Sequence, residues 1–389
     1  MNNENQKMIY VSCAPGLEQY LATEIQKLGI NISIQKVTHE SSSGIHGGEE
    51  EKGGIEFAGT DQQVFLCNLH LRTASRVVVR LGEFYAAAFS ELRKKASRLA
   101  WDQYLSAGQP VEVKVTCHKS RLYHSDAVAE RVKGAIEDHF HKPPRIAVKD
   151  EKVQLILVRL VNDLCTISID SSGELLHRRG YRQAVAKAPL RETLAAGLLL
   201  ASGWKPGIPL IDPFCGSGTI PIEAAMLARG IAPGINRSFA FQKWNGFKVE
   251  AYNAMLNTVR KNIKTSQTPI YASDRDQGAV EMATANAART GVHQDIHFAC
   301  HALSNLHAQP GPGWIITNPP YGVRVSSAKD LRNLYASLGN LLRTDFQGWQ
   351  LALLCNDAKL VAALELGKPG STISLLNGGI PVKFSIFNQ

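Results

Sequence analysis

The sequence lacks the features of a secreted, membrane-spanning or metal-binding protein. No run in its 389 residues reaches the ~18 apolar residues that a transmembrane helix needs, and the polar stretch from Met1 to Lys7 contains no apolar signal core. The seven cysteines are dispersed, without a C-x-x-C pair or a His/Cys cluster at zinc spacing. We therefore predict a cytoplasmic protein that holds no metal.

Negative charge is scarce relative to positive charge. There are 34 Asp and Glu residues against 43 Lys and Arg residues, which leaves a formal net charge of +9. This excess favours a polyanionic partner such as nucleic acid, although many basic proteins bind nothing acidic. The length suffices for two or three domains, each with its own core.

Two common phosphate-binding motifs are also missing. The stretch 210–219, LIDPFCGSGT, reads as an apolar strand, a glycine turn and the start of a helix. The third glycine of a dinucleotide motif is replaced by Pro221, no acid follows at the expected distance, and there is no Gly-Lys-Ser/Thr loop. These details exclude a dinucleotide, and the turn is not a nucleoside-triphosphate loop.

Acidic residues stand at the tips of two predicted strands instead. Asp212 precedes the glycine turn, and Asp274 ends the next strand. Asp274 can bind a ribose diol, and Asp212 can meet an ammonium group directly or through water. S-adenosylmethionine carries both groups. Its carboxylate could bind at the N-terminus of a helix that Pro189 is expected to start, running from Leu190 to Leu200 with Arg191, Glu192 and Thr193 in its first turn. The simpler alternative is that these residues only cap turns and helices.

A second strand, in WIITNPPY at 314–321, ends in hydrogen-bond acceptors stiffened by proline. Pro319 and Pro320 fix two φ angles, so the Asn318 side-chain oxygen and the Pro319 carbonyl can be held rigidly. Two such acceptors would orient an exocyclic aromatic amine, and Tyr321 would stack on a flipped base. An isolated Asn-Pro-Pro-Tyr is usually a turn. Ligands of open α/β sheets bind beyond the carboxyl ends of the strands, so we expect both tips to face one site.

The order of predicted elements separates the chain into two halves. In the second half, strands at 208–212, 269–273, 295–299, 313–317 and 350–355 alternate with helices, which predicts a mostly parallel, doubly wound α/β sheet. The first half begins with a β-α-β-β-α-β order, including a strand at 30–37, that is typical of a ferredoxin-like fold. A second α+β unit follows, with helices expected at 89–100 and 125–140.

Two basic segments could contact a nucleic acid. The loop 118–124 combines Lys119, Arg121 and Tyr123, which suit phosphate contacts and base stacking, or it is a plain solvated loop. The junction 170–182 carries Arg178, Arg179 and Arg182, which could contact RNA phosphates or form the salt-bridged seam of a domain interface.

The first 172 residues resemble a THUMP RNA-binding module with its ferredoxin-like half, through the stretch 116–131, TCHKSRLYHSDAVAER. The segment 282–292, MATANAARTGV, is similar to class I methyltransferases. Taken whole, the chain resembles the THUMP-containing RNA guanine-N2 methyltransferases, in particular bacterial enzymes that modify 23S ribosomal RNA. The most specific segments are 176–182, 188–196, 212–225 and 317–324.

The resemblance implies an architecture and a chemistry. It implies a ferredoxin-like half at 1–75, a THUMP domain at 76–172 and a Rossmann-like, S-adenosylmethionine-dependent methyltransferase domain at 173–389. The substrate would be structured RNA, 23S ribosomal RNA or a large-subunit precursor, methylated on guanine N2. Catalytic roles fall on Asn318, Pro319, Pro320 and Tyr321. The expected cofactor-binding residues are Thr193, Asp212, Cys215, Gly216, Gly218, Asp274 and His301.

Two departures from the family pattern leave alternatives open. Cys300 and His301 stand where the family commonly has an acid for the adenine amine, and Gly322-Val323-Arg324 replaces the usual Gly-Glu-Arg. Rival interpretations are a transfer-RNA guanine-N2 methyltransferase, an enzyme acting on adenine N6 or a glutamine amide, and a non-catalytic RNA-binding assembly factor. The THUMP-like half argues against the second.

Overall fold

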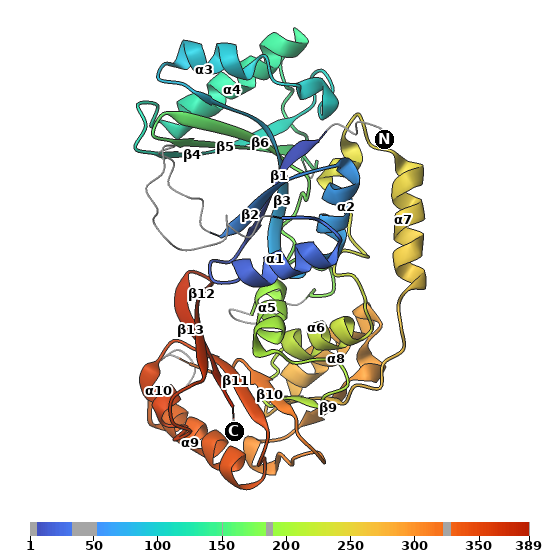
Figure 1. Cartoon of the computed structure of the whole chain (residues 1–389), viewed down its shortest axis with the longest axis vertical. Coiled ribbons are helices and arrows are strands. Elements are labelled where there is room, and N and C mark those ends of the chain that lie inside the picture. The colour runs from blue at the N-terminus through green and yellow to red at the C-terminus, as the bar shows by residue number, and fades with distance from the viewer. Residues whose placement is uncertain (1–5, 33–52, 150, 184–189, 322–327, 389) are drawn as a thin grey trace. The chain divides into compact units, whose positions relative to one another are not determined.

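The computed structural model describes residues 6–32, 53–149, 151–183, 190–321 and 328–388 (Figure 1). The chain forms two compact units. The first contains Met1–Cys13, Leu21–Leu176 and Arg237–Leu256, and the second contains Ala14–Tyr20, His177–Asn236 and Asn257–Gln389. The domain boundaries at 75 and 172 remain predictions.

The described part of the first unit is built on a six-stranded sheet in the order β2-β1-β3-β6-β5-β4. Only the β4–β5 pair among these neighbours is parallel. The ferredoxin-like and THUMP-like halves therefore share one sheet, joined where β3 pairs with β6. The strand predicted at 30–37 lies mostly outside the described residues. The elements are β1 (Lys7–Cys13), α1 (Glu18–Lys27), β2 (Gly54–Gly59), α2 (Asp61–His70), β3 (Ala74–Tyr85), α3 (Phe89–Ala96), β4 (Val111–His118), α4 (Ser125–Phe140), β5 (Gln154–Val161) and β6 (Leu164–Asp170).

One helix of this unit is shorter than predicted. The helix expected at 89–100 ends at Ala96, and a short 3-10 turn follows at Trp101–Gln103. Trp101 is fully buried, and its indole nitrogen donates a hydrogen bond to the Ala96 carbonyl at 2.8 Å. This bond satisfies one of the carbonyls left open at a helix end. The tryptophan that follows the predicted helix is therefore bonded back to the last residue of α3, which ends earlier than periodicity predicts.

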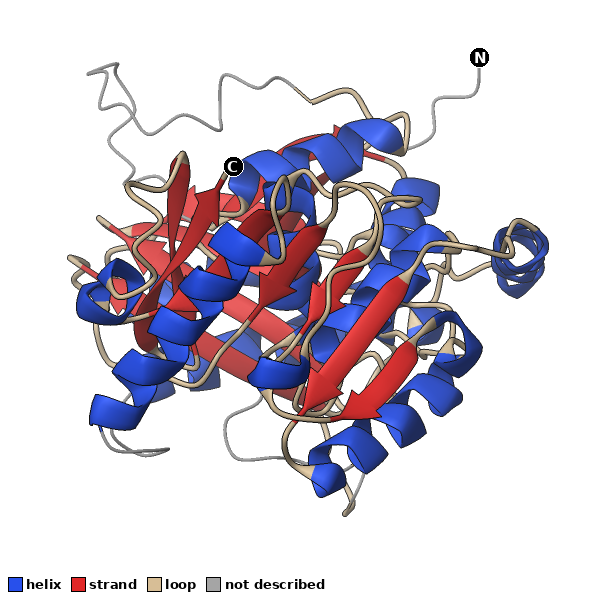
Figure 2. Cartoon of the chain, turned by 90° about the horizontal axis from the view of Figure 1, so that it is seen from below, coloured by secondary structure: helices blue, strands red, loops and turns tan. Residues whose placement is uncertain are grey.

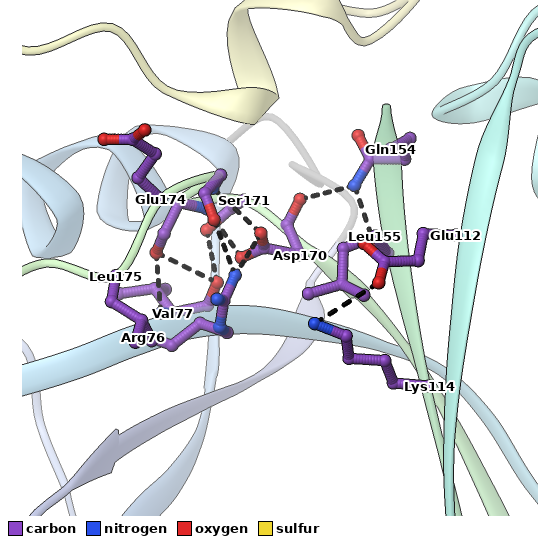
Figure 3. A network of polar contacts seen from close by, with 12 residues as sticks. Arg76, Val77, Glu112, Lys114, Gln154, Leu155, Asp170, Ser171, Glu174 and Leu175 are labelled. Atoms are coloured by element: carbon purple, nitrogen blue, oxygen red, sulfur yellow. Dashed lines mark hydrogen bonds and ion pairs between the residues drawn. The ribbon is translucent and has the colours of Figure 1, made fainter. Parts of the chain in front are cut away.

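A polar network ties β3 to β6 (Figure 3). Arg76 donates to the Asp170 carboxylate and, at 2.8 Å, to the Gly173 carbonyl. Burial raises the pKa of Asp170 to about 6, although the charge of Arg76 opposes the shift. The Gln154 amide donates to the Asp170 carbonyl at 2.7 Å and accepts from the Trp244 indole at 3.1 Å. Trp244 belongs to the segment Arg237–Leu256, so this network anchors a late segment of the sequence in the first unit.

The second unit has a seven-stranded sheet in its described part, in the order β12-β13-β11-β10-β7-β8-β9. β13 pairs antiparallel with both neighbours, and the other pairs are parallel. Figure 2 shows helices on both sides of these strands. The predicted doubly wound α/β class is confirmed. The elements are α5 (Glu192–Ser202), β7 (Leu210–Asp212), α6 (Thr219–Ala228), β8 (Ile270–Asp274), α8 (Gln277–Thr290), β9 (His297–Cys300), β10 (Trp314–Thr317), α9 (Ala328–Thr344), β11 (Gln350–Cys355), α10 (Ala358–Ala362), β12 (Ser371–Asn377) and β13 (Ile380–Phe387). The helix α7 (Val249–Lys261) belongs to the first unit as far as Leu256 and to the second unit from Asn257.

The helix α9 covers one face of this sheet. Leu331, Tyr335, Leu338 and Leu342 recur at helical spacing and are almost fully buried. They pack in one cluster with strand residues such as Ile315. The order of the strands reverses direction at the neighbouring pair β7 and β10, because β8 and β9 follow on one side and β11 on the other. Ligands of open α/β sheets bind at such a switch point.

No helix within the described ranges is both long and apolar enough to cross a membrane.

Candidate active site

Three strand ends bring the predicted site residues together. β10 pairs with β7 in the register Ile315↔Ile211, and β7 pairs with β8 in the register Asp212↔Ala272. Parallel strands end at the same edge of a sheet, so Asp212, Asp274 and Asn318 lie at the carboxyl ends of three neighbouring strands. The expectation that both tips face one site is met at the level of topology.

The glycine turn is fixed by backbone geometry. Gly216 and Gly218 have φ angles of 51° and 83°, in the left-handed region that favours glycine. A Cβ on Gly218 would lie 2.9 Å from the Cβ of Ala283 on α8, whereas a Cβ on Gly216 would meet nothing within 4 Å. The backbone N–H of Gly216 donates to the Asp274 carboxylate at 3.0 Å. Gly218 therefore allows α6 to approach α8, and Gly216 borders open space.

Asp212 is a buried carboxylate that links the two tips. It is 1% exposed, and its Oδ1 accepts hydrogen bonds from the Thr317 hydroxyl at 2.6 Å and the Phe214 N–H at 3.2 Å. Burial raises its pKa to about 7; the two hydrogen bonds lower it, and the charge of Asp274 raises it further. Among the described residues, no Lys or Arg side chain forms a salt bridge with Asp212. A bound cationic group would therefore stabilise its charged form.

The tip that follows β10 presents an acceptor without a partner. The Asn318 side-chain oxygen is buried and has no hydrogen-bond partner among the described residues. Its neighbours are held: the Pro320 carbonyl accepts from Tyr335 at 3.5 Å, and the Tyr321 hydroxyl accepts from Asn377 at 3.0 Å. A buried acceptor left unpaired costs free energy, which a ligand donor would recover. The atom expected to orient an amine is therefore available to do so.

A cavity of about 970 Å³ joins the two tips. Asp274, His301, Asn318 and Pro320 line it, together with Phe214. The other predicted site residues are not in this lining: Thr193, Asp212, Cys215, Gly216, Gly218, Pro319 and Tyr321. Its far wall comes from α9, through Asp330, Leu331, Leu334, Ala336, Ser337, Asn340 and Leu341, which sequence reasoning missed. The spacing of apolar residues in α9 predicts a helix. Which of its residues line the cavity depends on how the helix packs, which the sequence does not show.

Three cofactor predictions remain, and of these Cys215 is buried within the glycine turn. Thr193 and His301 differ in their surroundings. Thr193 is 4% exposed and lies in the first turn of α5, which begins at Glu192 rather than Leu190. Pro189, expected to start that helix, lies outside the described residues. His301 is half-buried, and its backbone N–H donates to the Asp274 carbonyl at 3.1 Å. That bond holds His301 beside Asp274 at the cavity.

The predicted RNA loop is exposed and anchored. Lys119, Arg121 and Tyr123 are exposed, and the Tyr123 side chain is 68% accessible. Buried Leu122 lies between them, and the backbone N–H of Arg121 donates to the Asp163 carboxylate at 2.7 Å. The Arg121 side chain also pairs with the Asp163 carboxylate at 3.4 Å and stays 75% exposed. The loop is therefore fastened to the β5–β6 turn while its cationic and aromatic side chains remain accessible to solvent.

The arginines of the junction divide into two groups. Arg178 is exposed. Arg179 is buried and pairs with buried Glu223 at 3.4 Å, while Arg182 donates to the Thr219 hydroxyl at 2.6 Å. These contacts lie within the second unit and favour a structural role for Arg179 and Arg182 over the predicted phosphate contacts. Sequence shows the charges but not their buried partners.

Across the described ranges, no group of three or more His, Cys, Asp or Glu side chains could hold a metal ion.

Known families match three segments of the chain. Residues 179–382 match the family described as "RMKL-like, methyltransferase domain", residues 86–170 match the THUMP domain, and residues 41–78 match the RlmL ferredoxin-like domain. The resemblance drawn from the sequence is therefore confirmed.

Relatives match over nearly the whole chain. The chain is 33% identical to proteins named Ribosomal RNA large subunit methyltransferase K/L from Psychromonas ingrahamii and Syntrophotalea carbinolica, over 95% and 97% of its length. It spans about half of those two relatives, 49% and 53%. The crystal structure of SMU.472, assigned as a methyltransferase and complexed with SAH, is 30% identical with a TM-score of 0.86, covering 98% of each chain. The first of the three family matches spans just over half of the chain, and on this ground the protein belongs to the RMKL-like methyltransferase family.

Proposed function

We propose that this protein transfers a methyl group from S-adenosylmethionine to the exocyclic N2 of a guanine in 23S ribosomal RNA. The observation that carries the proposal is the buried, unpartnered oxygen of Asn318, which lies at the same cavity as Asp274 and His301. The THUMP match and the ribosomal RNA methyltransferases among the relatives support the choice of RNA. The protein would act in the cytoplasm.

The residues of the first two strand ends fit S-adenosylmethionine. Asp274 has a carboxylate at the cavity for the ribose hydroxyls, and His301 lies beside it for the adenine ring. Buried Asp212 lacks a cationic partner in the described chain and would complement the ammonium group. Gly216 leaves open space where a side chain would stand. In this proposal Cys215 and Gly218 shape the turn, and Thr193 supports the methionine end.

The Asn318 tip positions the acceptor. When bound, S-adenosylmethionine supplies an electrophilic methyl carbon, and transfer forms a C–N bond as the C–S bond breaks to leave S-adenosylhomocysteine. The Asn318 oxygen and the Pro319 carbonyl would accept hydrogen bonds from the two amine hydrogens, which aims the nitrogen at the methyl carbon. As positive charge develops on nitrogen, both acceptors stabilise it, and the extra proton passes to solvent. Tyr321 would stack on the flipped guanine.

The first unit would bind the RNA. Lys119 and Arg121 would contact phosphates, and Tyr123 would stack on a base, because all three reach solvent from an anchored loop. Arg178 would add a phosphate contact in the second unit. The proposed domains are 1–75, 76–172 and 173–389.

Methyl transfer from labelled S-adenosylmethionine to total RNA tests the proposal. RNA from cells lacking this protein is the substrate, and the labelled fraction is digested to nucleosides. Label in N2-methylguanosine from 23S RNA is expected. Label in transfer RNA or in N6-methyladenosine would redirect the substrate assignment, and absence of transfer from protein that binds the cofactor would indicate a non-catalytic RNA-binding factor.

Replacing Asn318, whose buried oxygen is the main support for the proposal, gives a sharper test. We expect Asn318→Ala to reduce transfer by at least about 100-fold, because one acceptor of the amine is lost. Titration calorimetry with S-adenosylmethionine should show nearly unchanged affinity, since the cofactor contacts come from other strands. Full activity in Asn318→Ala would refute the assigned chemistry.

A further inference from the structure

A distant hairpin makes contact with the proposed catalytic tip. The Asn377 side-chain amide donates a hydrogen bond to the Tyr321 hydroxyl at 3.0 Å. Asn377 is the last residue of β12, which lies at the edge of the sheet, whereas Tyr321 follows β10, separated from β12 by β11 and β13 (Figure 1). We propose that Asn377 is a positioning residue for methyl transfer, which acts by fixing the phenol of Tyr321. This inference rests on the proposed function of the site.

The register of the hairpin aims Asn377 at the tip. Asn377 pairs with Ile380 across a turn whose glycines, Gly378 and Gly379, both have positive φ angles. Side chains alternate between the two faces of a strand, so Asn377 lies on the same face as Leu375, which is 3% exposed and packs inward. Leu376 lies on the other face and is 48% exposed. A shift of one residue in the register would turn Asn377 away from Tyr321.

The Tyr321 hydroxyl needs this partner. Tyr321 is half-buried and packs against the cluster that α9 forms with the sheet. Burial raises the pKa of its phenol, whereas the hydrogen bond from Asn377 lowers it. If the donor is removed, a partly desolvated oxygen loses a hydrogen bond and the ring can rotate more freely. The plane on which the target base would stack then loses its fixed orientation.

Asn377 completes a set of three side-chain contacts along the tip. Asp212 of β7 accepts from the hydroxyl of Thr317, and Tyr335 of α9 donates to the carbonyl of Pro320. The first contact fixes the residue before Asn318, and the second fixes the residue two positions after it. The contact from Asn377 extends this support to Tyr321, the residue proposed to hold the base. Misplacing a reacting group by about 1 Å can cost 100-fold in rate, so orientation at this point matters.

A double-mutant cycle between Asn377→Ala and Tyr321→Phe tests the inference. Each single variant removes one partner of the hydrogen bond, and we expect each to lower kcat by about 10-fold with the KM for S-adenosylmethionine unchanged. The double variant should be no slower than the singles. Asn377→Gln, which keeps the amide, should recover part of kcat. Leu376→Ala is the matched control on the opposite face and should keep full activity.

Either of two kinetic results would overturn the inference. One is an unchanged kcat in Asn377→Ala. The other is a double variant about 100-fold slower than the unsubstituted protein, which would mean that the two residues act independently.

A spectroscopic readout separates this inference from the proposed function. In protein labelled at the tyrosine ring carbon that bears oxygen, the resonance missing from Tyr321→Phe belongs to Tyr321. Asn377→Ala should shift this resonance and raise the pKa of the phenol, whether or not the RNA is methylated. A resonance that does not respond would refute the contact even in an active enzyme. A shifted resonance in protein that methylates no RNA would leave the contact standing and refute the function.

Discussion

At the residue scale, the site concentrates groups whose properties depend on burial. Asp212 is a carboxylate removed from water without a cationic neighbour in the described chain, and Asn318 has a buried oxygen without a donor. Both are unfavourable in the free protein and become favourable when a ligand supplies an ammonium group or an N–H. Sequence reasoning named both residues, because polar residues at the ends of apolar strands are informative. It did not reveal that Thr317 links the two tips, because that bond joins residues 105 positions apart.

The burial of Asp212 predicts that its charged carboxylate lowers the stability of the protein while it strengthens cofactor binding. Its pKa rises from 3.8 to about 7 on folding, so the native state holds a proton that the unfolded chain releases. The native state therefore loses stability as pH rises from about 4 to 7. We expect Asp212→Asn to raise the free energy of unfolding at pH 8 by on the order of 2 to 4 kcal/mol and to change it little at pH 4. Urea unfolding at both pH values measures this.

The same substitution should weaken cofactor binding. An ammonium group pairs with the ionised carboxylate, so calorimetry should show S-adenosylmethionine affinity falling below about pH 7 in the unsubstituted protein, and a lower, flatter profile in Asp212→Asn. An affinity that is unaffected by the substitution at pH 8 would exclude the ammonium contact. Equal stability of the two proteins at pH 8 would contradict the desolvated charge.

At the scale of elements, the strand-turn-helix from β7 to α6 could be predicted because its causes are local. An apolar strand, a turn with two glycines and an apolar helix specify that unit almost by themselves, and the carboxyl-end rule for parallel sheets then places Asp274 and Asn318 beside it. The elements that complete the site have non-local causes. The wall formed by α9 and the contact from the β12–β13 hairpin both depend on which distant surfaces meet.

The two glycines of the turn allow the local and non-local contributions to be measured separately. Gly216→Ala should destabilise the protein by about 1 kcal/mol, since alanine must adopt a left-handed conformation. Gly218→Ala has the same backbone cost and also drives a methyl group against Ala283, so we expect a total of about 2 to 4 kcal/mol. Urea unfolding without cofactor measures both values. Equal losses would show that α6 and α8 can separate at no cost.

At the scale of the whole molecule, the sequence order and the compact units do not coincide. Residues Arg237–Leu256 fall between elements of the second unit in the sequence but belong to the first unit. There, the ring of Phe241 stacks on that of Phe65 with centroids 4.4 Å apart, and Trp244 reaches Gln154. The segment shows no repeat or motif that would have revealed this, and its aromatic residues become informative only once their partners are known. The division into a THUMP-containing half and a methyltransferase half was predictable, because each half has its own pattern of elements.

The division of labour between the two halves predicts separable effects on binding. Replacing both Lys119 and Arg121 with alanine should weaken RNA binding and reduce the slope of log affinity against log salt by about 1 to 2, because each cation that neutralises a phosphate releases counterions. Lys114→Ala is the matched control, because this exposed cation lies on β4, outside the loop. Its loss should leave the slope almost unchanged. Filter binding across a salt series measures the slope, and calorimetry should show unchanged S-adenosylmethionine affinity, since the cavity and the loop belong to different units. Two results would contradict this prediction: an unchanged slope in the double variant, or an equal reduction of the slope in Lys114→Ala. Either would mean that the loop does not contact the phosphate backbone and that the net charge of +9 acts through other cations.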